Sequence, residues 1–97
     1  MFCVVLRFSH NKAQASLHMA EHKRWIQQGF DDGVFLVTGS LVDPPGGMVL
    51  AHNTTRDALQ ARVALDPFVA AEVVTAEILQ VAPNRADARL QFLMEHA

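Results

Sequence analysis

The chain has 97 residues, which fits one compact domain and leaves too little length for a second core. Eight lysine and arginine residues stand against ten acidic residues, so the chain lacks the positive excess that attracts nucleic acid. Cys3 is the only cysteine, which excludes an intramolecular disulfide and fits a reducing compartment. Arg7 interrupts the first apolar run, and no stretch approaches the roughly 18 apolar residues of a membrane span. We therefore expect a soluble, cytoplasmic protein with no nucleic-acid or membrane partner.

The first half of the chain changes from a strand pattern to a helix pattern and back. Residues 2–8 are rich in β-branched and aromatic side chains and predict a strand. Between residues 12 and 30 the apolar side chains recur at helical spacing. One side of this predicted helix carries Ala15, Met19, His22, Ile26 and Phe30. Residues 34–38 predict a second strand, and their unbroken apolar run indicates that both faces of the strand are covered.

A hairpin-like loop is predicted after the second strand. Residues 43–47 read Asp-Pro-Pro-Gly-Gly, and proline has no amide hydrogen to give to a strand ladder. This loop joins the second strand to a third, predicted at residues 48–52. Thr54, with Asp57 three positions later, resembles a capping box and predicts the start of a second helix.

The second helix is predicted to end at Asp66, since the following Pro67 disfavours helical geometry in the residue before it. Residues 72–81 alternate apolar and polar side chains and predict a fourth strand. Residues 84–97 mix apolar and charged side chains, which predicts a short terminal helix docked on the body or on a partner.

The predicted order is β-α-β-β-α-β, which is typical of the α+β class with a ferredoxin-like fold: one antiparallel sheet with both helices on one face. The other face would be bare, although the strands carry apolar side chains that need cover. Two sheets packed face to face would supply it, so we predict a homodimer of the dimeric α+β barrel type. We expect a single domain over residues 1–97, with a core at about 2–82 and a C-terminal tail at 83–97.

With this organisation, the chain resembles the YciI-like (YCII-related) family of small dimeric α+β barrel proteins. The resemblance covers about residues 2–82. Its features are the aliphatic first strand, a helix histidine followed eleven residues later by a glycine, a Gly-Ser step, the glycine-bearing loop and a motif after the second helix: His22, Gly33, Gly39-Ser40 and Asp66-Pro67-Phe68-Val69-Ala70.

The resemblance implies an enzyme that uses His22 and Asp66 as a pair, with no cofactor. The implied chemistry is acid/base catalysis of the lyase, dehydrohalogenase or isomerase type on a small organic substrate. Aromatic and ring-opened compounds are the implied substrate class, and loss of chloride from chlorinated hydroxyaromatics is one implied reaction. The alternative is a non-catalytic barrel that binds or senses a small ligand, or an accessory domain.

The residues themselves leave two interpretations open for each member of this pair. His22 lies within an apolar stripe, where an unpaired ring costs roughly 1–3 kcal/mol, so either a catalytic partner or a backbone carbonyl must hold it. Asp66 follows a helix C-terminus, where the helix dipole disfavours a carboxylate and a neighbouring imidazole would offset the cost. An Asx-type turn before Pro67 would explain Asp66 equally well.

Four further residues are candidates for substrate binding. Ser40 follows a glycine at a strand end, where a pocket rim is expected. Arg7 can pair with a substrate carboxylate or with Glu77 on a neighbouring strand, and the second is favoured. Trp25 can line a pocket or pack in the core. His18 lies four residues before His22, but two ligands are too few for zinc, so we expect no metal.

Overall fold

The computed structural model describes residues 1–94 and follows the predicted order of strands and helices. The strands are β1 (Phe2–Phe8), β2 (Phe35–Val42), β3 (Pro45–Ala51) and β4 (Val74–Gln80). The longer helices are α1 (Ala15–Asp31) and α2 (Arg56–Ala64), and α3 (Pro67–Ala70) is a single turn. Two 3₁₀ segments complete the chain, η1 (Lys12–Gln14) and η2 (Ala88–Met94).

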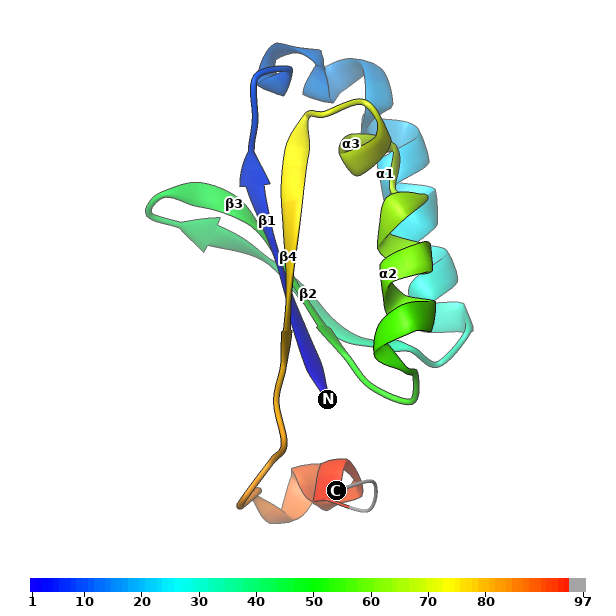
Figure 1. Cartoon of the computed structure of the whole chain (residues 1–97), viewed down its shortest axis with the longest axis vertical. Helices are drawn as coiled ribbons and strands as arrows, with labels where there is room; N and C mark the ends of the chain where they lie inside the picture. Colours follow the sequence, from blue (N-terminus) through cyan, green and yellow to red (C-terminus); the bar gives the residue numbers. More distant parts are fainter. Residues whose placement is uncertain (95–97) are drawn as a thin grey trace.

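The four strands form one antiparallel sheet in the order β2-β3-β1-β4. The long helices α1 and α2 lie side by side on one face of this sheet, and α3 follows α2 on the same side (Figure 1). This arrangement is the ferredoxin-like α+β fold, and that prediction is confirmed. Within residues 1–94, no helix is long and apolar enough to cross a membrane.

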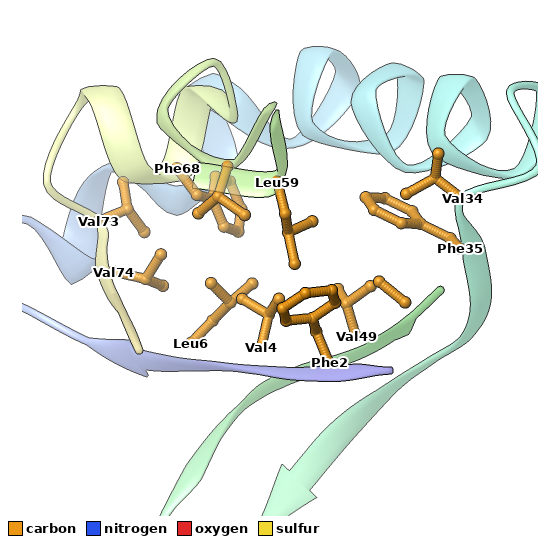
Figure 2. Close-up of a cluster of buried hydrophobic side chains, with 12 residues drawn as sticks. Phe2, Val4, Leu6, Val34, Phe35, Val49, Leu59, Phe68, Val73 and Val74 are labelled. Carbon is orange, nitrogen blue, oxygen red and sulfur yellow. The ribbon is translucent and has the colours of Figure 1, made fainter. Parts of the chain in front are cut away.

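The hydrophobic core fills the space between the sheet and the helices (Figure 2). Strand β1 points alternate residues into it, so that Phe2, Val4 and Leu6 are buried while the residues between them are only partly covered. Side chains from the helix layer meet them, among them Leu59 and Phe68 (Figure 2). One layer of helices therefore covers one face of the sheet and leaves the other face without cover from residues 1–94.

The loop predicted at residues 43–47 is shorter than expected. Strand β2 continues to Val42, and β3 already begins at Pro45, which lies opposite Val42. Pro45 is tolerated because it is the first residue of its strand, where a missing amide hydrogen removes no interior ladder bond. Gly46 needs to be a glycine, because a Cβ there would lie 2.4 Å from the carbonyl oxygen of Leu6.

The second helix begins one residue later than predicted. Thr55 is the N-cap, and its side chain accepts a hydrogen bond from the backbone N–H of Ala58 at 3.2 Å. The chain then forms the unpredicted turn α3, because Pro67 suits the first position of a helix as well as it ends the previous one.

The tail forms η2 and docks on the body. Leu93 is buried, and the ring of Phe92 contacts His52 edge-on at 5.5 Å between centroids. The terminal helix predicted at 84–97 is therefore a 3₁₀ segment at residues 88–94. Its last three predicted residues, 95–97, lie outside the described part of the chain.

Candidate active site

An open cavity of about 400 Å³ lies between α1 and the sheet, where β1 ends and β3 begins. Its size is in the range of small-molecule sites, and its lining is mostly apolar with a few polar side chains, as is usual for such sites. Helix α1 contributes one wall, and the strands and Phe68 contribute the rest. The lining residues are Leu6, Phe8, Met19, His22, Lys23, Ile26, Thr38, Gly39, Ser40, Gly46, Gly47, Met48, Val49, Phe68 and Val74.

His22 lines this cavity and is bonded to Asp66, although the two residues are 44 positions apart. The Nδ1 atom of His22 lies 2.7 Å from the Oδ1 atom of Asp66. The side chain of Asp66 is fully buried, whereas 12% of the His22 side chain is exposed. The acid is therefore sealed from solvent, and the imidazole stands between it and the cavity.

Local structure holds Asp66 in this position. Asp66 is the N-cap of α3, and its Oδ1 atom also accepts a hydrogen bond from the backbone N–H of Phe68 at 3.0 Å. The Asx-type turn and the contact with histidine therefore coexist on the same oxygen atom. Asp66 lies directly after the C-cap of α2, and its backbone N–H donates to the carbonyl oxygen of Val63 at 3.1 Å, but its side chain accepts from the first turn of α3.

The hydrogen-bond pattern determines which nitrogen of His22 is available for chemistry. An ionised carboxylate can only accept hydrogen bonds, so Nδ1 of His22 carries the hydrogen in this contact. In a neutral imidazole the other ring nitrogen, Nε2, then has a free lone pair. A ring that has taken up a proton at Nε2 can keep its Nδ1–H bond to the carboxylate. The pair can therefore accept a proton at Nε2 and return it.

The imidazole ring is held in place by stacking as well as by the acid. It lies parallel to the ring of Phe68, with centroids 3.9 Å apart and an interplanar angle of 3°. Phe68 is buried and follows Asp66 by two residues, so one short turn supplies both the hydrogen-bond partner and the stacking partner of His22. Such support keeps a catalytic group in a single orientation.

Of the other predicted site residues, only Ser40 lines the cavity. Trp25 packs against Phe35 and donates a hydrogen bond from Nε1 to the carbonyl oxygen of Arg62 at 2.9 Å, which links α1 to α2. His18 lies on α1, one turn before His22 and partly covered. Arg7 is exposed on β1 and forms no ion pair with Glu77 or any other acid within residues 1–94.

Sequence analysis missed Lys23 and the stacking role of Phe68. Lys23 follows His22 directly and lines the cavity on the same helix. The spacing of Met19, His22, Lys23 and Ile26 identifies it, because these four positions form one face of a helix. Lys23 was not among the predicted site residues because the predicted helix face was defined mainly by apolar side chains. No group of three or more potential metal-ligating side chains occurs in the part of the chain that the structure describes.

Comparison with known proteins gives a structural likeness. The fold is similar to that of a 5-chloro-2-hydroxyhydroquinone dehydrochlorinase from Burkholderia phenoliruptrix, solved in complex with 2,5-dihydroxybenzoquinone. The TM-score is 0.65 and the sequence identity is 15%, over 84% of this chain and 93% of that chain. No protein-family model and no curated protein sequence matches the chain. At this identity the likeness establishes the shared fold.

Proposed function

We propose that the protein is a lyase-type enzyme that transfers protons on a small ring compound bound in the cavity beside His22. The observation that carries the proposal is the contact between a cavity-lining imidazole and a fully buried carboxylate, 2.7 Å apart. In this mechanism Nε2 of His22 acts as the general base, and Asp66 orients the ring and balances the charge of the imidazolium. Asp66 does not touch the substrate and is a positioning residue.

Removal of hydrogen chloride from a chlorinated hydroxy ring fits this machinery. A hydroxyl proton of the substrate passes to Nε2, and a proton is returned to the chlorine-bearing ring carbon, which gives the keto form of the ring. Loss of a second hydroxyl proton then drives out chloride, which takes the electrons of the carbon–chlorine bond, so the product is a quinone and the net change is loss of HCl without an external oxidant or reductant. The likeness to a dehydrochlorinase supports this reaction type. We also propose that the chain belongs to the YciI-like family, because its resemblance to that family implies the same His-Asp pair.

The cavity suits a flat, compact substrate. Phe8, His22 and Phe68 all line the cavity, so a ring compound can pack against aromatic side chains there. Ser40 offers a hydroxyl on the β2 side. The cavity volume of about 400 Å³ is large enough for a single ring together with its substituents.

Turnover of 5-chloro-2-hydroxyhydroquinone under anaerobic conditions, followed by chloride release, tests the proposal. His22→Asn is expected to lower the rate by about 10²–10⁴-fold, the usual contribution of a general base. The matched control is His18→Asn, which changes a histidine one turn earlier on α1 and outside the cavity lining. Equal rates for wild type and His22→Asn would refute the base assignment. Ring binding without turnover of this or related compounds would favour the ligand-binding alternative.

We also propose that the protein is a homodimer built through the uncovered face of its sheet. On that face four apolar side chains lie opposite one another on neighbouring strands: Cys3, Val37, Leu50 and Leu79. Val5 lies on the same face two residues after Cys3, opposite Met48 on β3 and Glu77 on β4. Val37 and Leu79 are 48% and 45% exposed, which is unusual for a cluster of large apolar groups. Sedimentation equilibrium is expected to give twice the monomer mass, and Val37→Lys combined with Leu79→Lys is expected to give monomer.

A further inference from the structure

The wall that α1 contributes to the cavity contains a lysine. Met19, His22, Lys23 and Ile26 line the cavity at positions i, i+3, i+4 and i+7, so they share one face of the helix. Met19 and Lys23 are exposed on this face, whereas His22 and Ile26 are partly buried. The Lys23 ammonium is therefore in water beside the open cavity, where it can meet an anionic ligand.

The charged groups around the cavity are unbalanced. Lys23 is the one permanently charged side chain that lines the cavity in the described part of the chain. It forms no ion pair with a carboxylate of residues 1–94, and none of their aspartates or glutamates lines the cavity. Asp66, which is bonded to His22, is fully buried and does not line the cavity. The wall that a ligand meets therefore carries excess positive charge.

Proton abstraction produces the charge that this wall can balance. When a base removes a proton from a neutral ring compound, the ligand keeps a negative charge. A ligand that enters with one hydroxyl already ionised carries that charge from the start. Lys23 is adjacent to His22 on the same wall, and an ammonium group makes strong charge-assisted hydrogen bonds to an oxyanion.

We propose that the cavity takes an anionic ring compound, bearing an ionised hydroxyl or a carboxylate, and that Lys23 selects this anion over its neutral analogue. The proposal rests on the proposed function, because it assigns the substrate class of the same cavity. Lys23 is a binding and specificity residue in it, while the proton transfer belongs to His22.

Binding of matched ligand pairs by isothermal titration calorimetry tests this assignment on the full chain. One pair is 2,5-dihydroxybenzoquinone, which is ionised at neutral pH, and the neutral 2,5-dimethoxybenzoquinone. The other pair is benzoate and benzamide. Wild type is expected to bind the anion of at least one pair about tenfold more tightly than the neutral partner. Raising the ionic strength is expected to reduce this preference, because salt screens an exposed ion pair.

Two variants separate the role of Lys23 from the general charge of the helix. Lys23→Met keeps most of the unbranched side chain and removes its charged amine, so the preference for the anion is expected to disappear. Arg24→Met removes one positive charge from the next residue of α1, which is exposed, pairs with Glu21 and does not line the cavity. This control is expected to keep the full preference.

The proposal is overturned if wild type shows no preference for the anion in either pair, whether or not it binds. It is equally overturned if Lys23→Met keeps the preference, or if Arg24→Met loses it to the same extent. Failure here is distinguishable from failure of the proposed function. Chloride release that depends on His22 would stand whatever the lysine series gives, and an anion preference that depends on Lys23 would stand without turnover.

Discussion

Removing the imidazole of His22 should destabilise the protein mainly because it strands the acid behind it. Asp66 is fully buried, and its Oδ1 atom has two partners, Nδ1 of His22 at 2.7 Å and the N–H of Phe68 at 3.0 Å. Its Oδ2 atom is buried and has no hydrogen-bond partner within residues 1–94. After His22→Ala, one backbone N–H remains to stabilise a buried charge.

The expected cost of His22→Ala is about 3 kcal/mol, the upper end of the usual range for a buried acceptor that loses its hydrogen-bond partner, because this acceptor is a carboxylate. For a domain of 97 residues, each kcal/mol lowers the melting temperature by about 4–8 °C, so the shift should be about 12–24 °C. Asp66→Asn removes the charge but keeps an amide oxygen that can accept from the N–H of Phe68. The double variant His22→Ala/Asp66→Asn is therefore expected to be more stable than His22→Ala alone.

Urea unfolding followed by circular dichroism, with wild type, both single variants and the double variant at equal protein concentration, measures this cycle. If His22→Ala fails to fold, the double variant is still expected to fold. The reasoning is refuted if the second substitution leaves the stability of His22→Ala unchanged or lowers it, because the stranded charge would then not be the source of the loss.

Three further predictions concern other parts of the fold. Gly29→Ala should lower the free energy of unfolding by about 1–3 kcal/mol, because a Cβ there would lie 2.1 Å from the buried ring of Phe35; a variant of wild-type stability would contradict this. Hydrogen bonds from Arg62 and then Gln28 hold the pKa of the Asp32 carboxyl below its usual value. Wild type should therefore melt above Asp32→Asn at about pH 6, and the difference should shrink as the pH falls toward 3. Gly47→Val should fill part of the cavity and abolish ring binding in calorimetry, with little effect on the melting temperature.

The arrangement of strands and helices could be predicted from the sequence because composition and periodicity separate the strands from the long helices. Residues 2–8 are rich in β-branched and aromatic side chains, whereas the helical spacing of α1 reflects its packing on the rest of the domain. The turn α3 could not be predicted in this way, because four residues are too few for a period. The predicted strands at residues 34–38 and 48–52 stopped short of the hairpin, because a Pro-Pro-Gly-Gly run normally interrupts a strand ladder. In the structure Pro45 is the first residue of β3, opposite Val42, so the ladder continues up to the turn.

Of the candidate site, the sequence indicated His22, because a polar ring stands there within an apolar helix stripe. A histidine within an apolar stripe requires a partner, and only the resemblance to the YciI-like family implied that this partner is Asp66. The distance between His22 and Asp66 depends on how α3 packs against α1, which no local pattern specifies. Trp25 shows the opposite limit: the same position suits a cavity wall or a core contact, and its hydrogen bond to Arg62 makes it a core contact.

One oxygen atom of Asp66 serves both the turn that begins α3 and the imidazole of the cavity. Substitution of His22 and substitution of Asp66 should therefore differ in their effect on stability as homologous sequences diverge. Loss of the histidine alone leaves a buried carboxylate without its partner, whereas an amide in place of the acid removes the charge and keeps an acceptor for the N–H of Phe68. Homologues without a histidine at position 22 should therefore carry asparagine at position 66 more often than aspartate.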